Sequence, residues 1–81
     1  MWEVTISPRA ERALNKLPLT LQKRIDTAIN KLEEDPFHNS VKIQTMSDTW
    51  RIRVGDYRIL FQASKTRTIL ILDIDHRSNI Y

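Results

Sequence analysis

The sequence predicts an α+β fold in which two helices pack on one face of a β-sheet. Residues 50–62 alternate apolar and polar side chains around a Gly-Asp pair, which is typical of a β-hairpin. Residues 10–32 carry apolar side chains at helical spacing, interrupted by a proline. Residues 68–74 are nearly all apolar, as expected for a central strand. The predicted order is β-α-α-β-β-β-β, an N-terminal strand, an αα-hairpin and a four-stranded antiparallel meander.

The N-terminal segment predicts a strand followed directly by a helix. Trp2–Ile6 alternates apolar and polar residues, Ser7 suits a helix N-cap, and Pro8 suits the first helical position. The apolar stripe of this helix is Ala10, Ala13, Leu14 and Leu17. We expect the helix to end near Leu17, because Pro18 disfavours helical dihedral angles in the residue before it.

A second helix is predicted from Thr20 to Glu34, where Asp35 and Pro36 end it. Its buried stripe is Leu21, Ile25, Ala28, Ile29 and Leu32. Its polar side chains, expected largely in water, are Lys23, Arg24, Asp26, Asn30 and Lys31. The short break between the helices makes them an αα-hairpin that lies across one face of the sheet.

The C-terminal half predicts the meander. Val41–Met46 alternates as a strand, and Thr68–Ile74 is the last strand of the sheet. Regular alternation in that last strand places two sets of side chains on opposite faces. These sets are Leu70, Leu72 and Ile74, and Ile69, Ile71, Asp73 and Asp75.

The hairpin between these strands has a register that follows from its turn. Gly55 as the first of two loop residues suits a type II′ turn, so Val54 faces Tyr57 and Arg53 faces Arg58. One face then carries Trp50, Ile52, Val54, Tyr57, Ile59 and Phe61. The other face carries Arg51, Arg53 and Arg58.

Clustered arginines on a strand pair need a physical reason, because like charges on opposing strand residues destabilise a sheet. A bound anion supplies one, since the forked guanidinium group suits pairs of phosphate oxygens. The alternative is a solvated face in which the arginines separate or meet Asp73 or Asp75. Residues 42–81 hold seven Lys and Arg against four Asp, so the net charge of +3 lies in the half that contains the hairpin. This distribution favours a polyanionic partner.

Composition sets further limits. The length of 81 residues predicts one domain, 1–81. The absence of Cys excludes disulfides and fits a reducing, cytoplasmic location. The longest aliphatic run, Ile69–Leu72, is far too short for a membrane span. The two histidines are not spaced as zinc ligands, and Asp73-Ile74-Asp75 is too small a carboxylate set for two-metal catalysis, so we expect no metal and no cofactor.

Two segments, W-R-I-R-V-G-D-Y-R-I-L-F and the closing I-D-H-R-S-N-I-Y, together with the helical hairpin, resemble the RelE/ParE superfamily of toxins, and within it the RelE branch. The resemblance implies a metal-independent endoribonuclease that cuts messenger RNA in the ribosomal A site. It also implies a cognate RelB-like antitoxin that wraps the toxin, and contact with operator DNA only through that antitoxin.

The resemblance also implies the site residues. Its basic positions fall on Arg51, Arg53, Arg58 and Arg77, and its terminal tyrosine falls on Tyr81. Where some RelE-type enzymes have lysines, this sequence has Arg51 and Arg53, which hold a phosphate well but donate protons poorly.

Proton transfer could fall to Tyr81 or to His76. Nearby arginines would favour the ionised phenol of Tyr81 and the neutral imidazole of His76. Each residue has another interpretation: Tyr81 could stack on a base, His76 could be a hydrogen-bonded surface residue, and Arg77 could only pair with Asp73 or Asp75. Two other functions stay open. One is a ParE-like inhibitor of DNA gyrase without enzymatic activity, and the other is an inactive relative that acts only in antitoxin and operator complexes.

Overall fold

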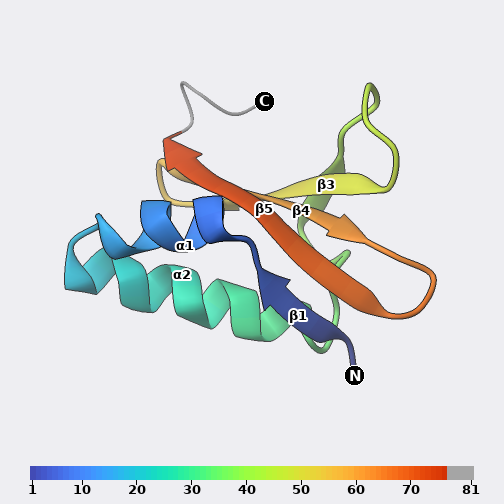
Figure 1. The fold of residues 1–81 in the computed structure, drawn as a ribbon, viewed down its shortest axis with the longest axis horizontal. Coiled ribbons are helices and arrows are strands. Elements are labelled where there is room, and N and C mark those ends of the chain that lie inside the picture. Colours follow the sequence, from blue (N-terminus) through green and yellow to red (C-terminus); the bar gives the residue numbers. More distant parts are fainter. Residues whose placement is uncertain (77–81) are drawn as a thin grey trace.

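The computed structural model, which describes residues 1–76, has two helices on one side of a five-stranded sheet (Figure 1). The elements in chain order are β1 (Glu3–Ile6), α1 (Pro8–Asn15), α2 (Leu19–Leu32), β2 (Ser40–Lys42), β3 (Thr49–Val54), β4 (Tyr57–Ala63) and β5 (Thr68–His76). This is the predicted order. We call the sheet face opposite the helices the open face.

The sheet has the strand order β1-β5-β4-β3-β2. Strands β2 to β5 form the predicted antiparallel meander, while β1 pairs with β5 in parallel, so the sheet as a whole is mixed. The parallel pair places β5 between two neighbours, which agrees with its apolar sequence.

The helices bury the predicted stripes. Ala10, Leu14, Ile25, Ile29 and Leu32 are buried against the inner face of the sheet. The backbone N–H of Ala10 donates to the Ser7 hydroxyl at 3.1 Å, and that hydroxyl donates to the Leu72 carbonyl at 3.0 Å. The N-cap therefore also ties α1 to β5. Within residues 1–76, neither helix is long and apolar enough to cross a membrane.

Both helices are shorter than predicted. Helix α1 ends at Asn15 rather than near Leu17, and α2 ends at Leu32 rather than Glu34. In each case the residues after the helix continue as a turn, with N–H groups bonded three residues back. The difference lies within the usual fraying of helix ends.

The prediction for the second strand was wrong in extent. Strand β2 covers only Ser40–Lys42, and the chain turns at Ile43, whose N–H donates to the Thr49 carbonyl at 2.8 Å. Ile43 is buried, and Asp48 has a left-handed φ of 51° that completes the reversal into β3. The burial of Ile43 at the start of a tight connection ended the strand early.

The predicted hairpin register is confirmed at every pair. Val54 lies opposite Tyr57 and Arg53 lies opposite Arg58. Gly55 has φ of +59°, and the next residue is not among those with positive φ. A type II′ turn has positive φ only at its first central residue, whereas type I′ needs it at both. These φ angles therefore agree with the predicted type II′ turn.

The predicted alternation of β5 was wrong after Leu72. The register between β4 and β5 shifts there, because Leu60 lies opposite Asp73 while Phe61 lies opposite Ile71. Leu72 is thus the extra residue of a β-bulge. The buried side chains of β5 are accordingly Ile69, Ile71 and Ile74 rather than one unbroken parity set.

Candidate anion-binding site on the open face of the sheet

The three predicted strand arginines meet in one shallow pocket on the open face. Arg51 and Arg53 on β3 and Arg58 on β4 line it together with Asn39 and Val41, and its volume is about 130 Å³. We call these three side chains the arginine cluster. Arg51 and Arg58 are half-buried and Arg53 is exposed, so the three charged groups are accessible from the surface.

The two carboxylates near the cluster, Asp73 and Asp75, lie against different partners. Asp75 lies directly opposite Arg58 across the β4–β5 pair, while Arg53 lies opposite Arg58 on its other side. Asp73 instead forms an ion pair with Arg9 of α1, with 3.2 Å between Nε and Oδ2. The alternative was that the arginines separate or meet Asp73 or Asp75. The strand register places Asp75 beside Arg58, whereas Asp73 pairs with Arg9 of α1.

Arg58 is the central member of the cluster. Its Nη1 donates to the carbonyl of Tyr57 at 3.4 Å, which directs the guanidinium along its own strand. Three arginines line the pocket and one carboxylate, that of Asp75, is paired beside them, so the pocket has an excess of positive charge. Such a pocket can bind an anion and stabilise negative charge on its oxygen atoms.

Asn39 is a site residue that the sequence reasoning missed. It lines the arginine pocket from the loop before β2, with a left-handed φ of 63°. Asn is one of the few residues besides Gly that adopt this conformation readily, and its amide can both donate and accept hydrogen bonds. An Asn directly before a short strand was the only signal available.

His76 is not brought to the arginine cluster. It ends β5 opposite Tyr57, and the two rings meet edge to face with centroids 5.6 Å apart. Directly paired residues share a face of the sheet, and Tyr57 belongs to the face that packs under the helices. The imidazole therefore lies on the other side of the sheet from Arg58.

Two predicted site residues, Arg77 and Tyr81, lie outside the described residues. Within residues 1–76, no three His, Asp or Glu side chains are grouped to hold a metal ion. The polar side chains that line the arginine pocket are three guanidinium groups and the amide of Asn39.

Comparisons with known proteins show the family of this chain. Residues 4–81 match the model of the family described as ParE toxin of type II toxin-antitoxin system, parDE. The chain is 30% identical over 83 residues to toxin RelG of Mycobacterium tuberculosis, covering 99% of this chain and 95% of that protein.

Solved structures give the same result. A chain of the archaeal RelE–RelB complex from Pyrococcus horikoshii OT3 superposes with a TM-score of 0.84 at 28% identity, covering 94% of each chain. A chain of the toxin–antitoxin complex RelBE2 from M. tuberculosis gives a TM-score of 0.80 at 26% identity, covering 94% of this chain and 98% of that one. The family match, the relatives and the shared fold together show that this chain belongs to the RelE/ParE family and is a toxin of a type II toxin–antitoxin system.

Proposed function

We propose that this toxin is a ribosome-dependent endoribonuclease that cleaves messenger RNA in the ribosomal A site. The observation that carries the proposal is the arginine cluster, in which Arg51, Arg53 and Arg58 from two adjacent strands line one pocket. A toxin that acted only through protein contacts would have no need for three like charges at one point of a sheet, where they oppose folding. A phosphodiester supplies the negative charge that such a pocket needs.

The reaction uses a nucleophile that RNA itself carries. The ribose 2′-oxygen attacks the adjacent phosphorus and forms a new P–O bond, while the bond to the 5′-oxygen of the next nucleotide breaks. One proton leaves the 2′-hydroxyl and another is added to the 5′-oxygen, giving a 2′,3′-cyclic phosphate and a 5′-hydroxyl. The toxin must align the strand, stabilise the charge on the non-bridging oxygens and transfer these two protons.

The arginine cluster would perform the second of these tasks. Arg58, between Arg53 and Asp75, is placed to donate to the phosphoryl oxygens, with Arg51 and Arg53 on the neighbouring strand. Guanidinium groups remain protonated at working pH, so they stabilise charge without exchanging a proton. The protons must then be carried by other groups.

The candidates for proton transfer are Tyr81 and His76. The imidazole of His76 lies on the face of Tyr57 rather than of Arg58, which favours Tyr81 in the proposed mechanism. We propose Tyr81 as the general base and water or a ribosomal group as the proton donor to the leaving oxygen, while Arg77 stabilises the negative charge that develops there.

The proposed partners follow from the same function. The solved neighbours are RelE–RelB and RelBE2 complexes, so we propose a RelB-like antitoxin that wraps this chain and restrains it. The other partners are the ribosome and messenger RNA in the cytoplasm, and operator DNA would be contacted only through the antitoxin.

The test compares two arginine variants in single-turnover cleavage of ribosome-bound messenger RNA, with 5′ ends mapped at nucleotide resolution. Arg58→Ala should lower the cleavage rate by about 100-fold or more, because it removes a donor aimed at the developing charge. The matched control is Arg12→Ala, which removes an exposed arginine on α1 away from the arginine pocket and should cleave at the wild-type rate.

Two results would contradict the proposal. One is wild-type cleavage by both Arg58→Ala and Arg53→Ala, which would remove the role of the arginine cluster. The other is intact messenger RNA together with inhibited DNA gyrase, which would make the protein a ParE-like inhibitor. Intact RNA and active gyrase would indicate an inactive relative.

A further inference from the structure

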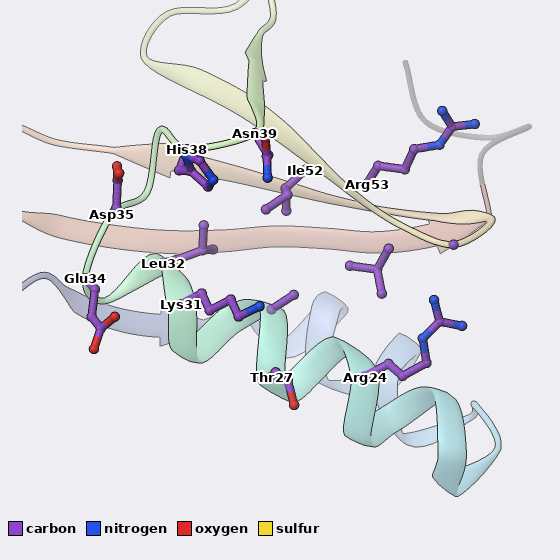
Figure 2. Close-up of a pocket in the computed structure, with 13 residues that line it drawn as sticks. Arg24, Thr27, Lys31, Leu32, Glu34, Asp35, His38, Asn39, Ile52 and Arg53 are labelled. Atoms are coloured by element: carbon purple, nitrogen blue, oxygen red, sulfur yellow. The ribbon is translucent and has the colours of Figure 1, made fainter.

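A second, larger cavity lies on the other side of β3. It is a groove of about 720 Å³ between α2, β3 and the loop that follows α2. Its floor is apolar, with Ala28 and Leu32 from the helix and Ile52 and Val54 from the strand. None of the residues that line it is Phe, Trp or Tyr, and the one ring that lines it is the imidazole of His38, which Figure 2 shows away from the hairpin end.

The charges of this groove are separated along its length. Figure 2 shows Arg24 and Arg53 at the end near the hairpin turn, Lys31 between the two ends, and Glu34 and Asp35 at the opposite end. An anionic chain would be attracted to the first end and repelled from the second. The part of the groove that suits an anion is therefore its hairpin end.

The exposed side chain of Arg24 lies close to the hairpin turn. A Cβ atom at Gly55 would lie 3.3 Å from Nη2 and 3.4 Å from Nη1 of Arg24. A side chain at position 55 would therefore displace the guanidinium by a few tenths of an ångström. The contact joins α2 to the hairpin that carries the arginine cluster.

The groove and the arginine pocket meet the same two residues at the edge of β3. Arg53 and Asn39 line both cavities. An RNA strand that leaves the arginine pocket past Arg53 would reach the hairpin end of the groove. Because every nucleotide carries a phosphate, the next cation along this route meets a neighbouring phosphodiester.

We propose that Arg24, together with Arg53, forms a second phosphate subsite that binds the RNA backbone beside the scissile phosphate. The proposal rests on the function proposed above and adds a binding residue on α2. The subsite contacts backbone rather than bases, since it offers guanidinium donors and no Phe, Trp or Tyr. The phosphodiester belongs either to the messenger RNA or to ribosomal RNA next to it, and the two have the same chemistry.

The experiment measures single-turnover cleavage of ribosome-bound messenger RNA over a range of toxin concentrations. Arg24→Gln should raise the half-saturating concentration by about three- to tenfold, because one charge-assisted contact is lost, and should leave the maximal rate within about twofold. The slope of a plot of the logarithm of affinity against the logarithm of salt concentration should become shallower by about one. The matched control is Lys23→Gln, the same charge change one residue earlier on α2, at a position that does not line the groove.

Two further arms complete the design. Arg24→Lys keeps the charge and should recover part of the lost affinity. Shortening the messenger RNA on either side of the cleaved codon identifies the source: an Arg24→Gln effect that disappears with short RNA assigns the phosphate to the message, and one that persists assigns it to ribosomal RNA.

The outcomes separate this subsite from the proposed function. If the wild-type toxin cleaves and Arg24→Gln behaves like Lys23→Gln, the subsite is wrong while the endoribonuclease stands. If Arg24→Gln weakens only the binding of the antitoxin, the groove is a protein-docking surface and the subsite is again wrong. If the wild-type toxin does not cleave at all, the proposed function itself fails.

Discussion

At the scale of single residues, the site is defined by what each arginine faces. Arg58 lies between Arg53 and Asp75, so its guanidinium has a neighbouring cation on one strand and a carboxylate on the other. Asp73, which the sequence offered as an equal partner, pairs with Arg9 instead. Because the arginines of this cluster cannot exchange protons under ordinary conditions, the proposed cleavage needs an acid–base group of a different residue type.

That reasoning gives a prediction for the two candidate proton carriers. Tyr81→Phe should lose more than about tenfold in single-turnover cleavage rate, because positioned acid–base groups contribute about 10²- to 10⁴-fold. His76→Gln should lose less, since His76 packs against Tyr57 on the other sheet face. Near-wild-type cleavage by Tyr81→Phe, with loss only in Tyr81→Ala, would assign Tyr81 to base stacking.

At the scale of elements, the β3–β4 hairpin positions the cluster, and its turn is set by one glycine. Gly55 has φ of +59°, and Arg24 approaches it closely from α2. The bulge at Leu72 then shifts β5 so that Ile74 faces the core opposite Ile59, and Asp75 lies opposite Arg58. Without the extra residue, the carboxylate beside Arg58 would fall on the other face.

The turn gives a stability prediction. Gly55→Ala should lower the free energy of unfolding by about 1–2 kcal/mol, because a Cβ is strained at this φ and would press on the Arg24 guanidinium. Chemical denaturation monitored by circular dichroism measures the loss. Gly55→Asn is the matched control and should lose less, since Asn tolerates positive φ. Equal stability of Gly55→Ala and the wild type would show that the turn changes type without cost.

At the scale of the whole molecule, the two faces of the sheet are used differently. The inner face packs on α1 and α2 through a continuous core that includes Ile59, Phe61 and Ile71. The open face carries the arginine cluster, in a chain whose net charge is +3. A toxin restrained by a partner needs this surface covered or reshaped, and an acidic or amphipathic segment that orders on binding suits it.

We therefore expect the cognate antitoxin to cover or distort the arginine cluster. Arginine-specific labelling followed by mass spectrometry should show Arg51, Arg53 and Arg58 protected in the complex and reactive in the free toxin. Hydrogen exchange of β3 and β4 reports distortion in the same samples. Unchanged labelling and unchanged exchange at this face would contradict the expectation.

The sequence by itself determined the order of elements, the helical stripes and the hairpin register, because these depend on local periodicity and on the turn chemistry of Gly55. It therefore placed Arg51, Arg53 and Arg58 together correctly. Only the tertiary structure decided the parallel pairing of β1, the short β2, the bulge at Leu72 and the entry of Arg24 and Asn39 into the cavities. These features depend on contacts between segments far apart in the chain, for which a single sequence carries no periodic signal.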